Sequence, residues 1–245
     1  MVVRLTDRDL RMLAKCAICR WLTTDQIKRL YFPNATLNAV QKRLRKLSDA
    51  GYLRSHQEHR TAESIHTVGP KGRAIVEEKG VEVMALSDAP RQSEHLWGVN
   101  ELRLAVEQGR VPVDYFFAYW ELSDLGWKHR VIPDAVFAVR DPDRRAFVAE
   151  YDRGTETLDK LLGKLTRYET GLEGFPFEAV LIVTQETRRL DLLASEMRRK
   201  AVSVPVLVAT LGAVRETGLW DAAFVELQEG TKRVILKGGA ENGER

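Results

Sequence analysis

Three acidic residues in the middle of the chain have the types and spacing of a metal-binding phosphodiester site. Glu150 and Asp152 lie two residues apart in the apolar segment Ala146–Asp152, so on a strand they share one face. Asp134, in the strand before, can join them across a short Asp-Pro-Asp turn. Three carboxylates on one face repel each other unless a divalent cation or basic groups lie among them. We therefore expect these three residues to be ligands of Mg²⁺ or Mn²⁺.

Basic residues follow directly after the acidic segment. A helix predicted over Thr155–Gly171 carries Lys160, Lys164 and Tyr168 at successive i, i+4 positions, which lie along one edge. An acidic sheet face beside a basic helix edge suggests phosphodiester chemistry, with Lys160 or Lys164 stabilising the charge on the phosphate. The alternative is a solvated strand end whose acids pair with Lys160 or Arg153.

The elements that position these residues form a domain predicted over residues 94–230. The periodicity predicts helices over 94–108, 155–171 and 186–201, and strands over 111–123, 131–140, 146–152, 177–185, 204–210 and 222–228. Residues 80–93 mix turn residues with a short apolar patch and are expected to be a linker. Residues 231–245 are expected to be a disordered tail.

A second domain is predicted over residues 1–79. Thr6 and Asp9 form a capping-box pattern at the start of a first helix, and a second helix begins after Thr23 or Thr24 and ends at Pro33. Two short strands then flank a polar turn, and Gly69-Pro70 leads into a further helix.

The third predicted helix of this domain, Thr36–Ala50, has one apolar and one polar face. The expected buried stripe is Leu37, Val40, Leu44 and Leu47. The side chains away from it are Asn38, Gln41, Lys42, Arg43, Arg45 and Lys46. Groups that hydrogen-bond base edges here alternate with groups that bind phosphates, as a helix in the major groove requires. We expect these six, with His59 and Arg60 of the polar turn, to bind DNA.

Charge is divided unequally between the two predicted domains. Residues 1–79 hold 16 Lys and Arg against 8 Asp and Glu, whereas the rest hold 22 against 27, within a chain of net charge +3. A basic first domain joined to an acidic remainder predicts that the first domain contacts a polyanion. No apolar run approaches the length of a membrane span, and no signal peptide or membrane contact is expected.

Two cysteines three residues apart, Cys16 and Cys19, lie within the first predicted helix. Zinc ligation with His56 and His59 is the alternative to core packing, but those histidines lie about forty residues on and there is no second Cys-x-x-Cys. We expect both cysteines to pack in the core, reduced, in the cytoplasm.

Residues 5–79 resemble a winged helix-turn-helix, most clearly in RKLSDAGYLRSH and HTVGPKGRAIVEE. The resemblance implies that Thr36–Ala50 enters the major groove and that His56–Ala62 lies near the minor groove or the backbone. Such a module can instead serve only for protein docking or dimerisation.

The order helix, three strands, helix, strand after residue 93 resembles the restriction-endonuclease-like, or PD-(D/E)XK, fold. The resemblance implies an α+β protein whose second domain has a mixed central sheet, with Asp134 and Glu150 as its acids. Glu94 or Glu101 would be the helix glutamate that some members add. The pattern departs at Asp152, where the fold keeps a lysine, and Lys160 or Lys164 would have to replace it.

Both halves together, including PDAVFAV and EYDRGTE with the downstream Lys and Tyr, resemble the replication-relaxation family of plasmid and mobile-element proteins. The resemblance implies a protein of replication or transfer control that binds double-stranded DNA and a replication or conjugation protein, with a homodimer as the default for such binders. Three functions stay open: a DNA-binding protein with a scaffolding second domain, a metal-dependent endonuclease or nickase, and a transcriptional regulator with a dimerising or ligand-sensing second domain. No organic cofactor is expected.

Overall fold

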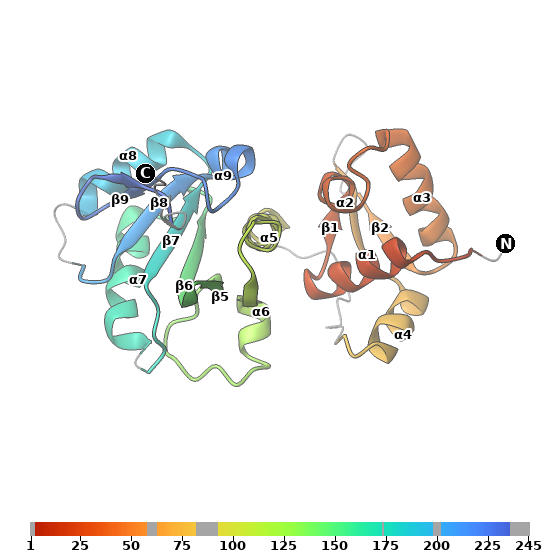
Figure 1. Ribbon diagram of the computed structural model, residues 1–245, viewed down its shortest axis with the longest axis horizontal. Helices are drawn as coiled ribbons and strands as arrows, with labels where there is room; N and C mark the ends of the chain where they lie inside the picture. Colours follow the sequence, from red (N-terminus) through yellow and green to blue (C-terminus); the bar gives the residue numbers. More distant parts are fainter. Residues whose placement is uncertain (1–2, 58–62, 82–92, 173, 198–201, 236–245) are drawn as a thin grey trace, which may run out of the picture. The chain divides into compact units, whose positions relative to one another are not determined.

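The chain folds into two compact units, Met1–Asn100 and Glu101–Arg245 (Figure 1). The computed structural model describes residues 3–57, 63–81, 93–172, 174–197 and 202–235. The division between the units falls inside helix α5 (Ser93–Glu107), whereas the linker was predicted over residues 80–93, most of which lie outside the described residues.

The first unit combines four helices with a small antiparallel sheet. Its elements before α5 are α1 (Asp7–Ile18), β1 (Leu22–Thr23), α2 (Thr24–Tyr31), α3 (Leu37–Asp49), β2 (Leu53–His56), β3 (Ile65–Val68) and α4 (Pro70–Glu78). The strands pair in the order β1-β3-β2, so β2 and β3 form a hairpin that β1 extends. The second and third helices and the hairpin match the predicted elements to within two residues. The first helix was expected to continue to about Leu22, but α1 ends at Ile18.

Local hydrogen bonding explains where these helices begin. Thr6 and Thr23 each form a capping box. The threonine hydroxyl accepts a hydrogen bond from the amide of Asp9 or Gln26, three residues later, and the side chain of that residue accepts one from the threonine amide. Thr36 caps α3 by accepting a hydrogen bond from the Ala39 amide. The three helix starts were therefore readable from the sequence.

The apolar faces of these helices pack into one core. Cys16 and Cys19 are both buried and unbridged in this core, as predicted, and burial raises the pKa of the Cys16 thiol. Val40, Leu44 and Leu47 of α3 are also buried there. Leu37 was predicted to join them but is 50% exposed, because it occupies the first position of α3, where the helix extends past the core.

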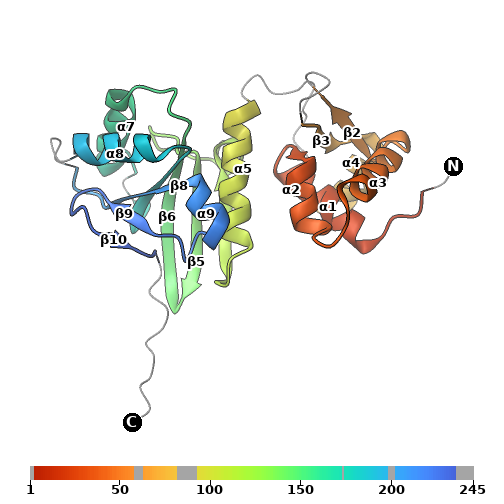
Figure 2. The ribbon, with the colours of Figure 1, turned by 90° about the horizontal axis from the view of Figure 1, so that it is seen from above.

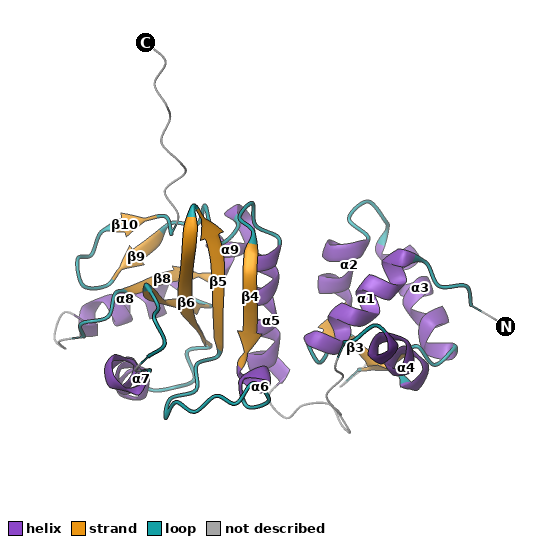
Figure 3. Ribbon diagram, turned by 60° about the horizontal axis from the view of Figure 1, so that its bottom comes forward, coloured by secondary structure: helices purple, strands orange, loops and turns teal. Residues whose placement is uncertain are grey.

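The second unit is built on one mixed sheet (Figure 3). Its elements after α5 are β4 (Val113–Ala118), α6 (Tyr119–Leu122), β5 (Ala135–Asp141), β6 (Asp143–Asp152), α7 (Leu158–Gly171), β7 (Ala179–Thr184), α8 (Thr187–Met197), β8 (Val206–Thr210), α9 (Leu211–Thr217), β9 (Phe224–Glu226) and β10 (Lys232–Arg233). The strand order is β10-β9-β8-β7-β6-β5-β4, in which β6-β7 and β7-β8 are parallel and the other pairs antiparallel. The predicted α+β class with a mixed sheet is confirmed.

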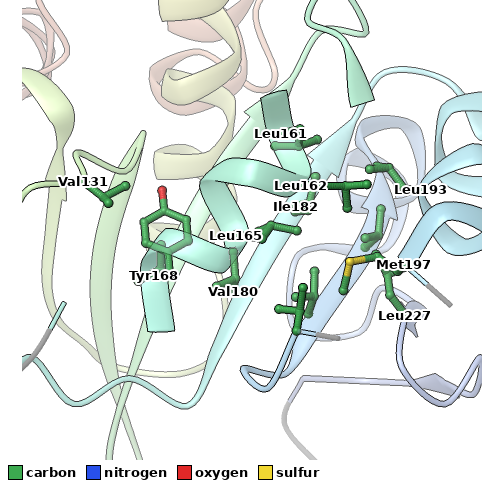
Figure 4. Packing of buried hydrophobic residues seen from close by; sticks show 14 of the residues in the cluster. Val131, Leu161, Leu162, Leu165, Tyr168, Val180, Ile182, Leu193, Met197 and Leu227 are labelled. Carbon is green, nitrogen blue, oxygen red and sulfur yellow. The ribbon is translucent and has the colours of Figure 1, made fainter. Parts of the chain in front are cut away.

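Helices α7 and α8 cover one face of this sheet (Figure 2). Leu161, Leu162 and Leu165 of α7 meet Val180 and Ile182 of β7 in a buried cluster. The Tyr168 ring lies in the same cluster near Val131 (Figure 4). The face that carries the acidic residues of β6 is therefore covered by two helices.

Aromatic rings fill the opposite face. Phe137 stacks between Phe116 and Phe147, with ring centroids 5.8 Å and 5.3 Å away, and meets Trp220 edge-on. Gly109 lies so close to this indole that an added Cβ would fall 1.8 Å from Trp220 Nε1. The absence of a side chain at position 109 therefore allows Trp220 to close this core.

Three parts of the second unit differ from the sequence-based prediction. The strand expected over 111–123 ends at Ala118, because Glu121 accepts a hydrogen bond from the Ala118 amide and starts α6. Helix α9 was not predicted. Strand β10 lies in the expected disordered tail, where Lys232 pairs with Val225, and residues 236–245 of that tail lie outside the described residues. No described helix has the length and apolar character that crossing a membrane requires.

Candidate functional site

Asp134 and Glu150 converge at the edge where β5 begins and β6 ends. The antiparallel register pairs Ala135 with Ala149, so its continuation by one residue sets Asp134 opposite Glu150. An Asp134 carboxylate oxygen accepts a hydrogen bond from the Tyr151 amide at 2.8 Å, which fixes it beside β6. The two carboxylates therefore share one site, as the sequence predicted.

Helix α7 supplies the other two groups of this site. Lys164 Nζ donates to Glu150 Oε2 at 2.6 Å and lies 4.0 Å from Asp134 Oδ1. The Tyr168 hydroxyl donates to the other oxygen of Glu150. Because Lys164 and Tyr168 are four residues apart, one turn of α7 brings both above β6.

Burial shifts the titration of this cluster. Desolvation, together with the charge of Asp134, raises the pKa of Glu150 to about 7. Burial alone would lower the pKa of Lys164, but the charges of Glu150 and Asp134 and the hydrogen bond to Glu150 raise it. Burial and the Glu150 charge also raise the pKa of Tyr168. Glu150 therefore titrates near neutral pH, while Lys164 stays charged.

Asp152 does not join this cluster, although it points to the same face as Glu150. Its two oxygens bind Arg189 of α8 at 2.6 Å and 3.2 Å, and its Oδ1 also accepts from the Gly154 amide at 3.0 Å. Arg189 lies 37 residues further along the chain, so no local pattern shows this partner. The predicted convergence of three carboxylates is replaced by a pair and a separate ion pair.

The remaining residues predicted for this site lie outside it. Lys160 is exposed on the first turn of α7, where its amide bonds to the Thr157 cap. Glu101 is buried and pairs with Arg215 of α9 at 3.4 Å, and Glu94 belongs to the first unit. Within the described ranges, no three His, Cys, Asp or Glu side chains are grouped as a metal ion would require.

The chemistry open to the second unit follows from these contacts. Two carboxylates and an ammonium group in one buried site fit a phosphodiester-cleaving centre with two acidic metal ligands, not three. The same contacts also fit a closed structural ion pair, since both oxygens of Glu150 already bind protein donors.

Helix α3 presents a polar face in the first unit. Five of the predicted DNA-binding residues are exposed on it: Asn38, Gln41, Lys42, Arg45 and Lys46. Val40, Leu44 and Leu47 hold the opposite side of α3 in the core. The exposed face therefore combines two amides, which can read base edges, with three cations, which can bind phosphates.

Arg43 has a structural role instead of belonging to that face. Its guanidinium binds the buried carboxylate of Asp9 in α1 and the carbonyl oxygen of Arg4 at 3.0 Å. Burial would raise the pKa of Asp9, but hydrogen bonds from Arg43 and Thr6 lower it. Arg43 thus joins α3 to α1. His59 and Arg60 lie outside the described residues.

A groove of about 400 Å³ runs beside the polar face of α3 and was not predicted. Gln41 and Arg45 line it from α3, and Ser55 and His66 from the β2–β3 hairpin. The His66 ring is buried between the hydroxyls of Thr24, at 2.9 Å, and Ser55, at 3.0 Å. Burial lowers the pKa of His66 to about 4, so the ring is neutral near pH 7. The polar residues of the hairpin were readable from the sequence, but their position beside α3 was not.

Comparison with known proteins identifies a family. The family model described as replication-relaxation matches residues 10–176, which include α3 and the Asp134–Glu150–Lys164 cluster. Neither the curated proteins nor the solved structures contain a match to the chain.

Proposed function

The chain belongs to the replication-relaxation family, and from this membership we propose that it is a DNA-binding protein of plasmid or mobile-element replication or transfer control. In this proposal the first unit acts as a winged helix-turn-helix that reads duplex DNA. The second unit serves as a scaffold or docks a replication or conjugation protein.

The observation that carries the proposal is the composition of the exposed face of α3. Asn38 and Gln41 supply hydrogen-bonding amides, and Lys42, Arg45 and Lys46 supply positive charge next to them. A solvated helix face needs no such alternation, whereas insertion into a major groove uses both kinds of group. The positive excess of residues 1–79 would draw this face to DNA.

The test is selection of a bound sequence from a random duplex pool, followed by affinity measurements on the selected site. Gln41→Ala should cost about 1–3 kcal/mol on that site and relax its sequence preference. Lys46→Ala should weaken binding to all duplexes alike. Lys79→Ala removes the same charge from the exposed end of α4 and serves as the control. Equal effects of Lys46→Ala and Lys79→Ala would contradict the role given to α3.

A scaffolding role for the second unit rests on the closed hydrogen bonding of its acidic cluster. Glu150 binds Lys164 and Tyr168, and Asp134 accepts from the Tyr151 amide, so these acids already contribute to the fold. The acidic excess of residues 80–245 opposes wide contact of this unit with a DNA backbone.

The second candidate is a metal-dependent endonuclease or nickase, favoured by the convergence of Asp134, Glu150 and Lys164. Asp134 and Glu150 would hold Mg²⁺ or Mn²⁺, which would activate water for attack on the phosphate. Lys164 would offset negative charge on the phosphate.

Nicking of supercoiled plasmid with added Mg²⁺ or Mn²⁺ separates the two candidates. If the protein is an endonuclease, the wild type nicks the plasmid and Asp134→Asn and Lys164→Met abolish the nicking. Lys160→Ala, on the exposed first turn of the same helix, should leave the nicking unchanged. If the wild-type protein binds its selected site but does not nick the plasmid, the result supports the scaffold role.

A further inference from the structure

A small basic pocket lies at the carboxyl ends of two parallel strands in the second unit, apart from the Glu150 cluster. Strands β6 and β7 end in register at Asp152 and Thr184, and the chain continues from β7 into α8. A cavity of about 250 Å³ opens there. It is lined by Arg153, Gly154, Thr184, Gln185, Glu186, Arg188, Arg189 and Leu192.

The charge of this pocket favours an anion. Three arginines line it against one carboxylate, that of Glu186. The Asp152 carboxylate and the Glu156 carbonyl oxygen hold the Arg189 guanidinium in place, the latter at 2.7 Å. The first turn of α8, an 11-residue helix, borders the same space, and its amide groups add positive potential.

Thr184 provides an independent indication of a ligand. Its side chain is fully buried, it lines the pocket, and its hydroxyl has no hydrogen-bond partner in the described part of the chain. A buried hydroxyl without a partner destabilises the fold, because it has lost its bonds to water. An oxygen of a bound anion in the pocket would restore that bond.

We propose that this pocket binds a phosphate group, held by Arg153, Arg188 and Arg189 with the α8 N-terminus, and by the Thr184 hydroxyl. A tetrahedral oxyanion fits within the cavity, and arginine, of which three line it, is suited to bidentate contact with phosphate. The phosphate can belong to a free nucleotide or to a DNA backbone, and the site does not depend on DNA reading by α3.

The experiment is calorimetric titration of the full chain with three probes: inorganic phosphate, dAMP and a short single-stranded oligonucleotide. Arg188→Ala should weaken binding of the preferred probe at least tenfold. Arg167→Ala removes an exposed arginine near the C-terminal end of α7 and should leave binding of that probe unchanged. Preference for dAMP would identify a nucleotide site, and preference for the oligonucleotide a backbone site.

Thr184→Val separates a binding role from a packing role. Valine removes the unpaired hydroxyl at similar volume, so the melting temperature should rise or stay unchanged while phosphate affinity falls severalfold. The double variant Lys42→Ala/Lys46→Ala should bind phosphate like wild type, which keeps this result independent of the α3 proposal. The proposal is overturned if none of the three probes binds saturably, or if Arg188→Ala and Arg167→Ala behave alike.

Discussion

Glu150 links the titration of a single side chain to the stability of the second unit. Its pKa in the folded chain, about 7, lies above the ordinary value of 4.5, because it is buried next to Asp134. The folded state therefore holds the proton more tightly than the unfolded state does. The resulting stabilisation is complete below pH 4.5 and is lost as the pH rises through about 7.

Glu150→Gln should remove this pH dependence, since glutamine does not titrate. Between pH 4.5 and about 7 the melting temperature of the wild type should fall relative to that of the variant, because only the wild type loses the proton. Thermal unfolding followed by circular dichroism across this range measures the difference. Parallel profiles of the two proteins would show that Glu150 titrates normally.

Arg43 and Arg45 are two residues apart on α3 but have opposite surroundings, which predicts opposite variant behaviour. Arg43→Ala leaves the buried Asp9 carboxylate without its cation and should cost about 2–3 kcal/mol of unfolding free energy. Arg45→Ala, on the exposed face, should change stability by less than about 0.5 kcal/mol and weaken DNA binding. Denaturant unfolding and duplex titration of both variants test the contrast. Asp9→Asn should recover part of the stability lost in Arg43→Ala.

At the scale of elements, two helical glycines show how close packing differs from one helix to another. A Cβ on Gly72 of α4 would fall 2.2 Å from the Tyr52 carbonyl oxygen, whereas a Cβ on Gly163 of α7 meets nothing within 4 Å. Gly72→Ala should therefore destabilise the first unit by about 1–3 kcal/mol, because α4 must move away from the chain at Tyr52. Gly163→Ala should stabilise the second unit by about 0.5–1 kcal/mol through higher helix propensity. The unfolding free energies of the two variants give the comparison.

Local chemistry made most of these elements predictable. The capping residues Thr6, Thr23 and Thr36 and the turn glycine Gly51, whose φ is +83°, mark helix ends without reference to the rest of the fold. The convergence of Asp134 and Glu150 under one edge of α7 was predictable as well, because strand alternation and the helical repeat fix which side chains share a face. The choice of Lys164 over Lys160 was not.

Partners that are distant in sequence were not predictable. Asp152 has the same spacing as an additional ligand, yet Arg189 binds it from a helix beyond the next strand. In the sequence Arg43 cannot be told from the other basic residues of α3, but in the fold it pairs with Asp9 of α1. The unsatisfied hydroxyl of Thr184 likewise becomes visible only when α8 covers the end of β7. In each case the outcome depends on tertiary packing and not on the local pattern.

At the scale of the whole molecule, the division of charge predicts how salt acts on DNA binding. If two lysines of α3 contact phosphates, Lys42→Ala/Lys46→Ala should reduce the slope of log affinity against log salt by about 1.8, close to 0.9 for each contact. Affinity measured over a series of salt concentrations gives the slope. An unchanged slope would mean that the cations binding DNA lie elsewhere in the chain, and Arg188→Ala would then be the next variant to measure.

The mixed sheet also has a consequence for the route by which the second unit forms. Strands β4, β5 and β6 follow one another and pair antiparallel, and β5 and β6 are joined at a tight turn, so this last pair closes a short loop. Strands β7 and β8 pair in parallel, and each is separated from the preceding strand by a helix. Their pairing closes longer loops and is therefore expected to form more slowly. The β5–β6 hairpin, which carries Glu150, can thus form early and template the rest of the sheet. The acid–lysine cluster is then completed only when α7 docks, which makes it a late reporter of native assembly.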